Sequence, residues 1–182
     1  MIYLFIGKSG SGKNYMLEQM LQNKPHIKPM VSVTTRPPRV GEVNGVDYHF
    51  VSDEVFDNML ERNAFVEHRE YNTEFGVWKY ATLRKSNATT EDYAGIVDVQ
   101  GAIDIINSYA PSVKVQVFYV SAPDDVRLER AKERGSFDLD EWNRRLEKDK
   151  EDFSDNRLEE LNDLLIDKYG EYLFMLPNVS NN

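Results

Sequence analysis

Two kinds of hydrophobic pattern alternate along this chain, and the first pair opens it. Residues 1–6 form an apolar run rich in β-forming side chains, and the run stops at Gly7, which is typical of a buried parallel strand entering a turn. Over residues 13–23, apolar side chains recur at helical spacing and form a stripe along one face. The sequence therefore predicts a strand, a glycine-rich loop and a helix, in that order.

The rest of the chain repeats this alternation of predicted strands and helices. Strands that alternate with helices indicate an α/β fold, a parallel sheet flanked by helices and joined by right-handed crossovers. Asn44 and Gly45 have the chemistry of a hairpin turn, which predicts a small antiparallel lobe inserted in this fold. Helices are predicted over residues 52–63, 102–110 and 162–170 and on both sides of Gly135, and strands over residues 30–35, 93–101, 114–123 and 171–179.

Length and composition limit the classes of function that the chain can have. A chain of 182 residues fits one domain, and we find no linker or repeat that divides it. Its formal net charge of −9 would repel a polyanion, which argues against nucleic acid as a partner. The lack of cysteine excludes disulfides and thiolate zinc sites, and the three histidines have no metal-ligand spacing. No apolar segment of roughly 18 residues occurs, so we expect a soluble cytoplasmic protein with no membrane partner.

The clearest chemical signal follows the first strand. The loop matches GxxxxGK between a predicted strand and a predicted helix, which is the context of a phosphate-binding loop. Glycines let backbone N–H groups face a phosphate, the helix N-terminus adds a positive dipole end, and a lysine adds a point charge. An ordinary glycine-rich turn would not need a strand directly before it and a helix directly after it, so we favour a polyphosphate site. This phosphate loop comprises Gly7, Lys8, Ser9, Gly10, Ser11, Gly12, Lys13 and Asn14.

One position of the phosphate loop departs from its usual chemistry. The residue after the lysine is normally Ser or Thr, whose hydroxyl ligates Mg²⁺, and here it is Asn14. An amide oxygen can also coordinate a hard cation, although the longer side chain shifts that oxygen and Mg²⁺ tolerates little distortion. We therefore take Asn14 as the candidate Mg²⁺ ligand and keep slow or absent catalysis open.

A second motif carries a wider resemblance. The segment SVTTRPPRVGEVNGVDYHFVS, residues 32–52, resembles the guanylate kinase signature, in which a Ser, two Arg and a Tyr bind the acceptor nucleotide. With the phosphate loop, the later DVQGA and the arginines beyond it, the resemblance covers most of residues 1–145. It implies a kinase with ATP and GMP as substrates and Mg²⁺ as cofactor. It also implies a single domain, residues 1–182, with the phosphate loop at 7–14, a GMP-binding lobe at about 32–82 and a helical lid at about 127–145.

The resemblance assigns the acceptor to named residues. Arg36 and Arg39 would clamp the monophosphate, with the Tyr48 hydroxyl as a neutral donor; two solvated loop arginines are the plain alternative. Glu67 aligns with the carboxylate that accepts two hydrogen bonds from guanine, and Ser32 aligns with a further base contact. Taken alone, Glu67 would be an ordinary surface acid.

Two acceptor positions depart from the family pattern. Phe75 stands where the family has a second tyrosine, and Val77 lacks the usual Ser or Thr hydroxyl. The loss of two hydrogen bonds, at about 1 kcal/mol each, would weaken acceptor binding unless neighbours compensate. A deoxy or modified purine monophosphate therefore stays open as the acceptor.

Catalytic residues also follow from the resemblance. Asp98, after a predicted strand, matches the family's acid near the bound acceptor, and an ordinary strand-end aspartate is the alternative. Arg130, Arg134 and Arg145 have the spacing of the lid arginines that neutralise charge on the transferring phosphoryl group, although any charged helix supplies arginines. Asn178 is a weaker candidate on the adenine side.

These residues favour a phosphotransferase that moves the ATP γ-phosphoryl group to GMP without a covalent intermediate. The alternative is a guanylate-kinase-like binding module with weak or no catalysis, which Asn14 and the missing hydroxyls would favour. A scaffold would not need Lys13, the two clamp arginines or the three lid arginines, so their presence argues against this alternative. We expect a monomer or a homodimer.

Overall fold

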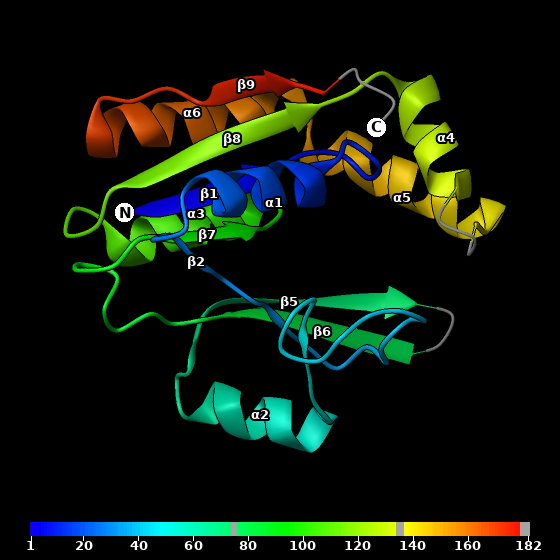
Figure 1. The fold of residues 1–182 in the computed structure, drawn as a ribbon, viewed down its shortest axis with the longest axis horizontal. Helices are drawn as coiled ribbons and strands as arrows, with labels where there is room; N and C mark the ends of the chain where they lie inside the picture. Colours follow the sequence, from blue (N-terminus) through cyan, green and yellow to red (C-terminus); the bar gives the residue numbers. More distant parts are fainter. Residues whose placement is uncertain (74–75, 134–136, 179–182) are drawn as a thin grey trace.

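A parallel sheet of five strands organises the chain in a computed structural model, which describes residues 1–73, 76–133 and 137–178 (Figure 1). Neighbouring strands follow the order β2, β7, β1, β8 and β9, all of them parallel. The strands of this main sheet are β1 (Ile2–Ile6), β2 (Lys28–Pro29), β7 (Tyr93–Ile96), β8 (Val115–Ser121) and β9 (Phe174–Pro177). The described helices are α1 (Lys13–Asn23), α2 (Asp53–Glu61), α3 (Val99–Tyr109), α4 (Asp124–Glu133), α5 (Leu139–Asp152) and α6 (Asp155–Tyr169). The predicted α/β fold is confirmed.

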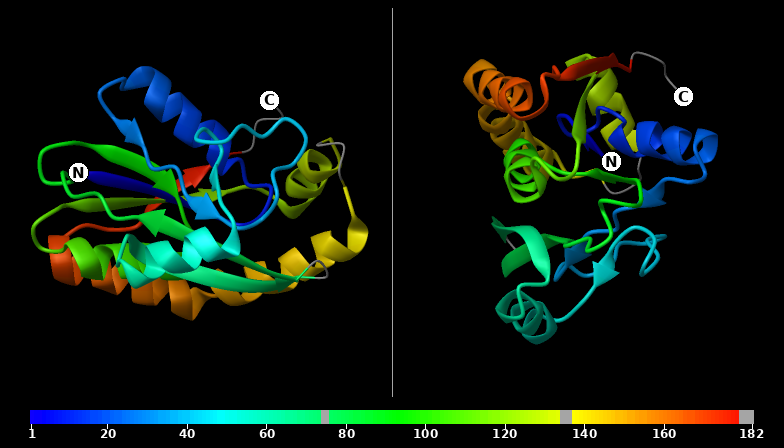
Figure 2. Two further views of the ribbon diagram at one scale, coloured as in Figure 1. Left: turned by 90° about the horizontal axis from the view of Figure 1, so that it is seen from below. Right: turned by 90° about the vertical axis from the view of Figure 1, so that its left-hand side faces the viewer.

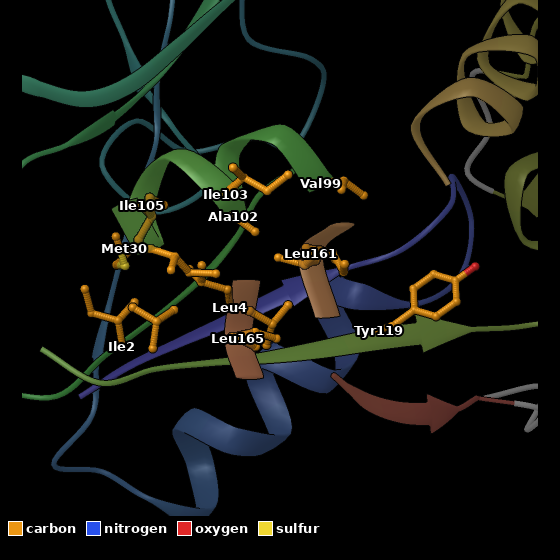
Figure 3. Close-up of a cluster of buried hydrophobic side chains, with 14 of the residues drawn as sticks. Ile2, Leu4, Met30, Val99, Ala102, Ile103, Ile105, Tyr119, Leu161 and Leu165 are labelled. Atoms are coloured by element: carbon orange, nitrogen blue, oxygen red, sulfur yellow. The ribbon is translucent and has the colours of Figure 1, made fainter. Parts of the chain in front are cut away.

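Helices cover both faces of the main sheet. α1 contacts β1 and β7 on one face, whereas α3 and α6 pack together on the other (Figure 2). Ile2, Leu4 and Ile6 alternate along β1 and are fully buried on the α3 and α6 side. Figure 3 shows members of this core, among them Met30, Val99, Ala102, Ile103, Ile105, Tyr119, Leu161 and Leu165. The core therefore fixes the strands whose carboxyl ends carry the phosphate loop and Asp98.

A smaller sheet forms an inserted lobe. Its strands are β3 (Val33–Thr34), β4 (His49–Phe50), β5 (Phe65–Thr73) and β6 (Gly76–Leu83), in the order β4, β3, β6 and β5. Phe56 of α2 packs with Val33, Phe65 and Ala81 in an apolar cluster of its own. β5 also contacts α3, so the smaller sheet lies between α2 and the main sheet (Figure 1).

The predicted position of the hairpin is wrong. The hairpin consists of β5 and β6, two antiparallel strands that the hydrophobic pattern did not predict. Asn44 makes an isolated parallel bridge to Tyr48, and Gly45 has a φ of +81° within a run of turns. Val43 and Val46 on either side are exposed, so no burial favours strands there.

The other elements are confirmed with shifted ends. α1 has the bounds that its stripe predicts. α3 begins at Val99, because the Asp98 carboxylate accepts a hydrogen bond of 2.6 Å from the Gly101 N–H and caps the helix. α6 begins earlier than predicted, and the strand predicted over 30–35 shortens to the two residues of β3. Within the described ranges, no helix is long and apolar enough to cross a membrane.

Leu161 of α6 tests the main core. Its side chain is fully buried between α6 and the sheet, so Leu161→Ala should lower the free energy of unfolding by about 2–5 kcal/mol through lost burial and a residual cavity. The matched control is Leu139→Ala, because Leu139 is 60% exposed at the start of α5. Urea unfolding measures both changes, and equal losses in the two variants would contradict this packing.

Candidate functional site

A cavity of about 780 Å³ lies where the main sheet, the smaller sheet and α5 meet. β1 and β7 pair in parallel, so the phosphate loop and Asp98 leave the sheet at the same edge. The smaller sheet forms a second wall, and α5 adds a charged side. Lys8, Ser11 and Arg130 are described but do not line the cavity. The candidate residues that do are Gly7, Ser9, Gly10, Gly12, Lys13, Asn14, Ser32, Arg36, Arg39, Tyr48, Glu67, Asp98 and Arg145.

The phosphate loop places its lysine over its own backbone. Gly12 is the N-cap of α1 with a φ of +92°, and a Cβ there would lie 2.1 Å from Asn178 Nδ2, so glycine is required. Lys13 Nζ donates to the carbonyl oxygens of Gly7 at 2.6 Å and of Lys8 at 3.1 Å. The ammonium charge and the N-terminus of α1 thus face the same region, as a polyphosphate site needs.

Asn14 lies in the first turn of α1 with its side chain exposed at the cavity. The described residues contain no group of three or more His, Cys, Asp or Glu side chains arranged for a metal ion. Mg²⁺ at phosphate-transfer sites is commonly held by few protein oxygens together with water and substrate phosphates. One amide oxygen beside the phosphate loop fits such a site.

Three arginines, Arg36, Arg39 and Arg145, form a cation cluster on another side of the cavity. The Arg36 side chain is 4% exposed, donates to Glu42 at 2.8 Å and lies 5.4 Å from the centre of the Tyr48 ring. Desolvation, followed by the charges of Arg36 and Arg145, lowers the pKa of Arg39. The charges of Arg36 and Arg145 thus oppose the charge of Arg39, and a bound anion would relieve that repulsion. The cation cluster is therefore suited to a phosphate group.

Alternate residues of β5 face the cavity. Glu67, Arg69, Tyr71 and Thr73 all line it, as the two-residue period of a strand requires. Glu67 lies opposite Thr82 of β6 and accepts a hydrogen bond from the Thr82 hydroxyl. Sequence reasoning identified Glu67 and considered Thr73 as a compensating contact, but it missed Arg69 and Tyr71, although their two-residue spacing from Glu67 was a signal that could have found them.

Glu67 and Asp98 form a carboxylate wall. Burial raises the pKa of Glu67, and the charge of Arg69 acts against that rise. The Tyr71 hydroxyl donates to Asp98 Oδ2 at 2.9 Å, while the Gly101 N–H holds Oδ1 at 2.6 Å. Burial and the Asp98 charge raise the pKa of Tyr71, so this phenol stays a neutral donor. The wall offers carboxylate oxygens to a ligand that carries N–H donors.

The predicted lid arginines are placed differently from one another. Arg145 lines the cavity from α5, where it donates to Glu141 at 2.7 Å. Arg130 of α4 instead contacts the carbonyl oxygens of Gly10 at 3.3 Å and Ser11 at 3.2 Å. The structure therefore brings Arg145 to the cation cluster and leaves Arg130 against the phosphate loop backbone.

Two further candidates, Arg134 and Phe75, lie outside the described residues, as does Gly135. Asn178 is buried behind the phosphate loop, where its Nδ2 donates to the Ser11 carbonyl oxygen at 3.0 Å. It therefore braces the phosphate loop directly.

Comparison with known proteins shows the family to which the chain belongs. A family model for guanylate kinase matches residues 1–169. The chain belongs to the guanylate kinase family. It is 35% identical over 150 residues to a guanylate kinase of Neisseria gonorrhoeae, covering 81% of this chain and 71% of that protein. A guanylate kinase of Chlorobium luteolum is 35% identical over 151 residues, covering 81% and 74%. The crystal structure of guanylate kinase from Anaplasma phagocytophilum shares the fold, with a TM-score of 0.51 and 24% identity over 93% of this chain and 96% of that one.

This guanylate kinase family member also has a buried ion pair that sequence reasoning missed. Arg127 of α4 is 2% exposed and donates to Asp149 Oδ2 of α5 at 3.1 Å and to the Ser9 carbonyl oxygen at 2.9 Å. Asp149 Oδ2 also accepts from the Ser9 N–H at 2.9 Å. The pair joins α4 and α5 to the phosphate loop. Arg145, Asp149 and Asp152 recur at helical spacing, which was the available sign of a charged inner face on α5.

Removal of one member of this ion pair should lower the free energy of unfolding more than removal of both members. Arg127→Met leaves the Asp149 charge buried without its cation and should destabilise the guanylate kinase fold by about 3–5 kcal/mol. Adding Asp149→Leu should recover part of that loss, because no uncompensated charge remains. Urea unfolding of the single and double variants measures this, with Lys150→Met in the exposed Lys150–Glu147 pair as the control. A double variant less stable than the single one would contradict the argument.

Proposed function

We propose that this chain transfers the γ-phosphoryl group of ATP to GMP, giving ADP and GDP. The observation that carries the proposal is a single cavity that joins the phosphate loop, the cation cluster and the carboxylate wall. A polyphosphate donor and a monophosphate acceptor can bind there with their phosphates facing each other, so that positioning lowers the barrier. Membership of the guanylate kinase family supports the same reaction.

The donor half of the site is the phosphate loop. Its backbone N–H groups and the N-terminus of α1 bind the ATP phosphates, and Lys13 moves its charge from the loop carbonyls to them. Mg²⁺, held by Asn14 together with phosphate oxygens and water, would neutralise charge on the transferring group. Arg145, with Arg130 and Arg134 from the proposed lid at about 127–145, adds positive charge to the transition state.

The acceptor half lies in the proposed lobe at about residues 32–82. The cation cluster clamps the monophosphate through paired N–H donors, and the Tyr48 hydroxyl adds a neutral one. Glu67 accepts the adjacent N–H donors of guanine, and Ser32 and Asp98, which line the same cavity, are further acceptor contacts. The family resemblance adds Phe75, outside the described residues, as a proposed acceptor position. Adenine lacks those adjacent donors and would leave the carboxylate unpaired, which costs binding free energy.

The first test measures ADP formed from ATP and Mg²⁺ with GMP, dGMP, AMP, CMP and UMP offered separately. We expect turnover with GMP, and Lys13→Ala should lower kcat at least about 100-fold because a charge at the transferring phosphates is lost. Lys150→Ala, at an exposed lysine of α5, is the matched control. A folded protein without turnover on any acceptor would exclude the kinase, and equal rates with AMP and GMP would exclude the guanine contacts.

A second test concerns the metal position. Asn14→Ser places a hydroxyl where phosphate loops commonly provide one, so the Mg²⁺ concentration for half-maximal turnover should fall about tenfold. A Mg²⁺ titration of GMP-dependent turnover measures this change, and calorimetry of MgATP binding measures the affinity independently of catalysis. Tyr15→Ser, one position further along α1 at an exposed residue, is the control. An unchanged Mg²⁺ dependence in Asn14→Ser would remove Asn14 from the metal site.

A further inference from the structure

The two members of the carboxylate wall converge on one point. A Cβ added to Gly101 would lie 3.1 Å from Asp98 Oδ1 and 3.5 Å from Glu67 Oε2. The Glu67 side chain is 8% exposed and that of Asp98 is 25% exposed. Negative charges so placed repel each other, and burial raises the pKa of Glu67, which favours its protonated form. A protonated carboxyl would meet the N–H donors of guanine with a donor of its own.

Arg69 places a positive charge beside both carboxylates. Its Nη1 lies 3.9 Å from Glu67 Oε2, and its Nε lies 4.0 Å from Asp98 Oδ2. Both distances are ion-pair distances but exceed those of hydrogen bonds. The guanidinium therefore offsets the charge of the wall while leaving Glu67 Oε2 open to a donor from the ligand.

A chain of polar contacts holds Arg69 away from the carboxylate wall. The guanidinium donates to Asp104 of α3 and to the His68 carbonyl oxygen. Asp104 also accepts from Gln100 Nε2 at 2.9 Å, and Gln100 accepts from Arg157 of α6 at 2.5 Å. Because these contacts engage both terminal nitrogens of the guanidinium, Arg69 does not close onto the carboxylate oxygens that a base would use.

We propose that Arg69 is a positioning residue for the acceptor, which keeps the carboxylate wall negatively charged and open to the N–H donors of guanine. This inference rests on the proposed function and deepens it. Arg69 acts through Glu67 and need not touch the nucleotide. It supplies electrostatic support on the side of the cavity that carries the carboxylate wall.

The groups around Glu67 give the proposal a pH dependence. They are Arg69 of β5, Thr82 of β6, the α3 cap Asp98 and Asp104 of α3. Burial raises the pKa of Glu67, the Thr82 hydrogen bond and the Arg69 charge lower it, and the two aspartates raise it. GMP binding needs the ionised form, so affinity is present above this pKa and lost as pH falls through it. Without the Arg69 charge the pKa is higher, and the loss begins at higher pH.

Calorimetry of GMP binding without ATP tests this inference between about pH 5.5 and about pH 8.5. The proteins are the wild type, Arg69→Gln, Arg69→Lys and the control Arg62→Gln, at an exposed arginine that follows α2. For Arg69→Gln, we expect a Kd raised at least about tenfold near pH 6 and less than about threefold near pH 8.5. Arg69→Lys should restore most of the affinity, and Arg62→Gln should match the wild type. Circular dichroism confirms that each variant is folded.

The outcomes separate the two proposals. Wild-type binding together with the same Kd for Arg69→Gln at every pH would overturn the role of Arg69 and retain the proposed function. Weakening by the same factor at every pH, without rescue by Arg69→Lys, would also overturn it, because loss of shape rather than of charge would explain it. A wild type that binds no GMP at any pH would overturn the proposed function and this inference with it.

Discussion

Parallel pairing of β1 with both β7 and β8 is the constraint on which the site depends. Phe5 lies opposite Ile96 on one side and Phe118 on the other, so all three strands run to the same edge of the main sheet. The phosphate loop leaves β1 at that edge and Asp98 leaves β7 there. A slip of one residue in β1 would turn its buried side chains, including Leu4, to the opposite face. Burial of apolar side chains thereby fixes where the polar chemistry lies.

In the smaller sheet too, strand register decides which side chains face the cavity. In the β5–β6 hairpin, Glu67 lies opposite Thr82, Arg69 opposite Tyr80, and Tyr71 opposite Trp78. All six residues line the cavity, because alternate residues of each strand share one face. The α2 cluster around Phe56 anchors the start of the hairpin. The order of groups along this wall is therefore set by backbone pairing, and each group has a neighbour that orients it.

The features that could be predicted from the sequence are those that depend on residues close together in the chain. The phosphate loop and the α1 that follows need a few glycines, one lysine and a helical stripe, all contiguous in the chain. The hairpin was misplaced because turn residues at Asn44 and Gly45 are a local signal, whereas strand formation depends on burial that the exposed Val43 and Val46 lack. β5 went unpredicted because its inward positions carry Glu67 and other polar residues, so the usual apolar alternation is absent. The Arg127 ion pair joins residues far apart in the sequence, which no periodicity reveals.

Charge is separated by region within the cavity, and under the proposed function this separation would let one site distinguish a nucleotide from a nucleoside. Burial alone would raise the pKa of Glu42, but hydrogen bonds from the Arg36 guanidinium and the Arg39 N–H lower it, so Glu42 stays ionised. One carboxylate offsets one charge of a cluster that also contains Arg145. A monophosphate, with a charge near −2, supplies the remainder, whereas a nucleoside supplies none. In the proposed binding mode the base lies at the carboxylate wall, where a phosphate would be repelled, so the acceptor would bind in one orientation.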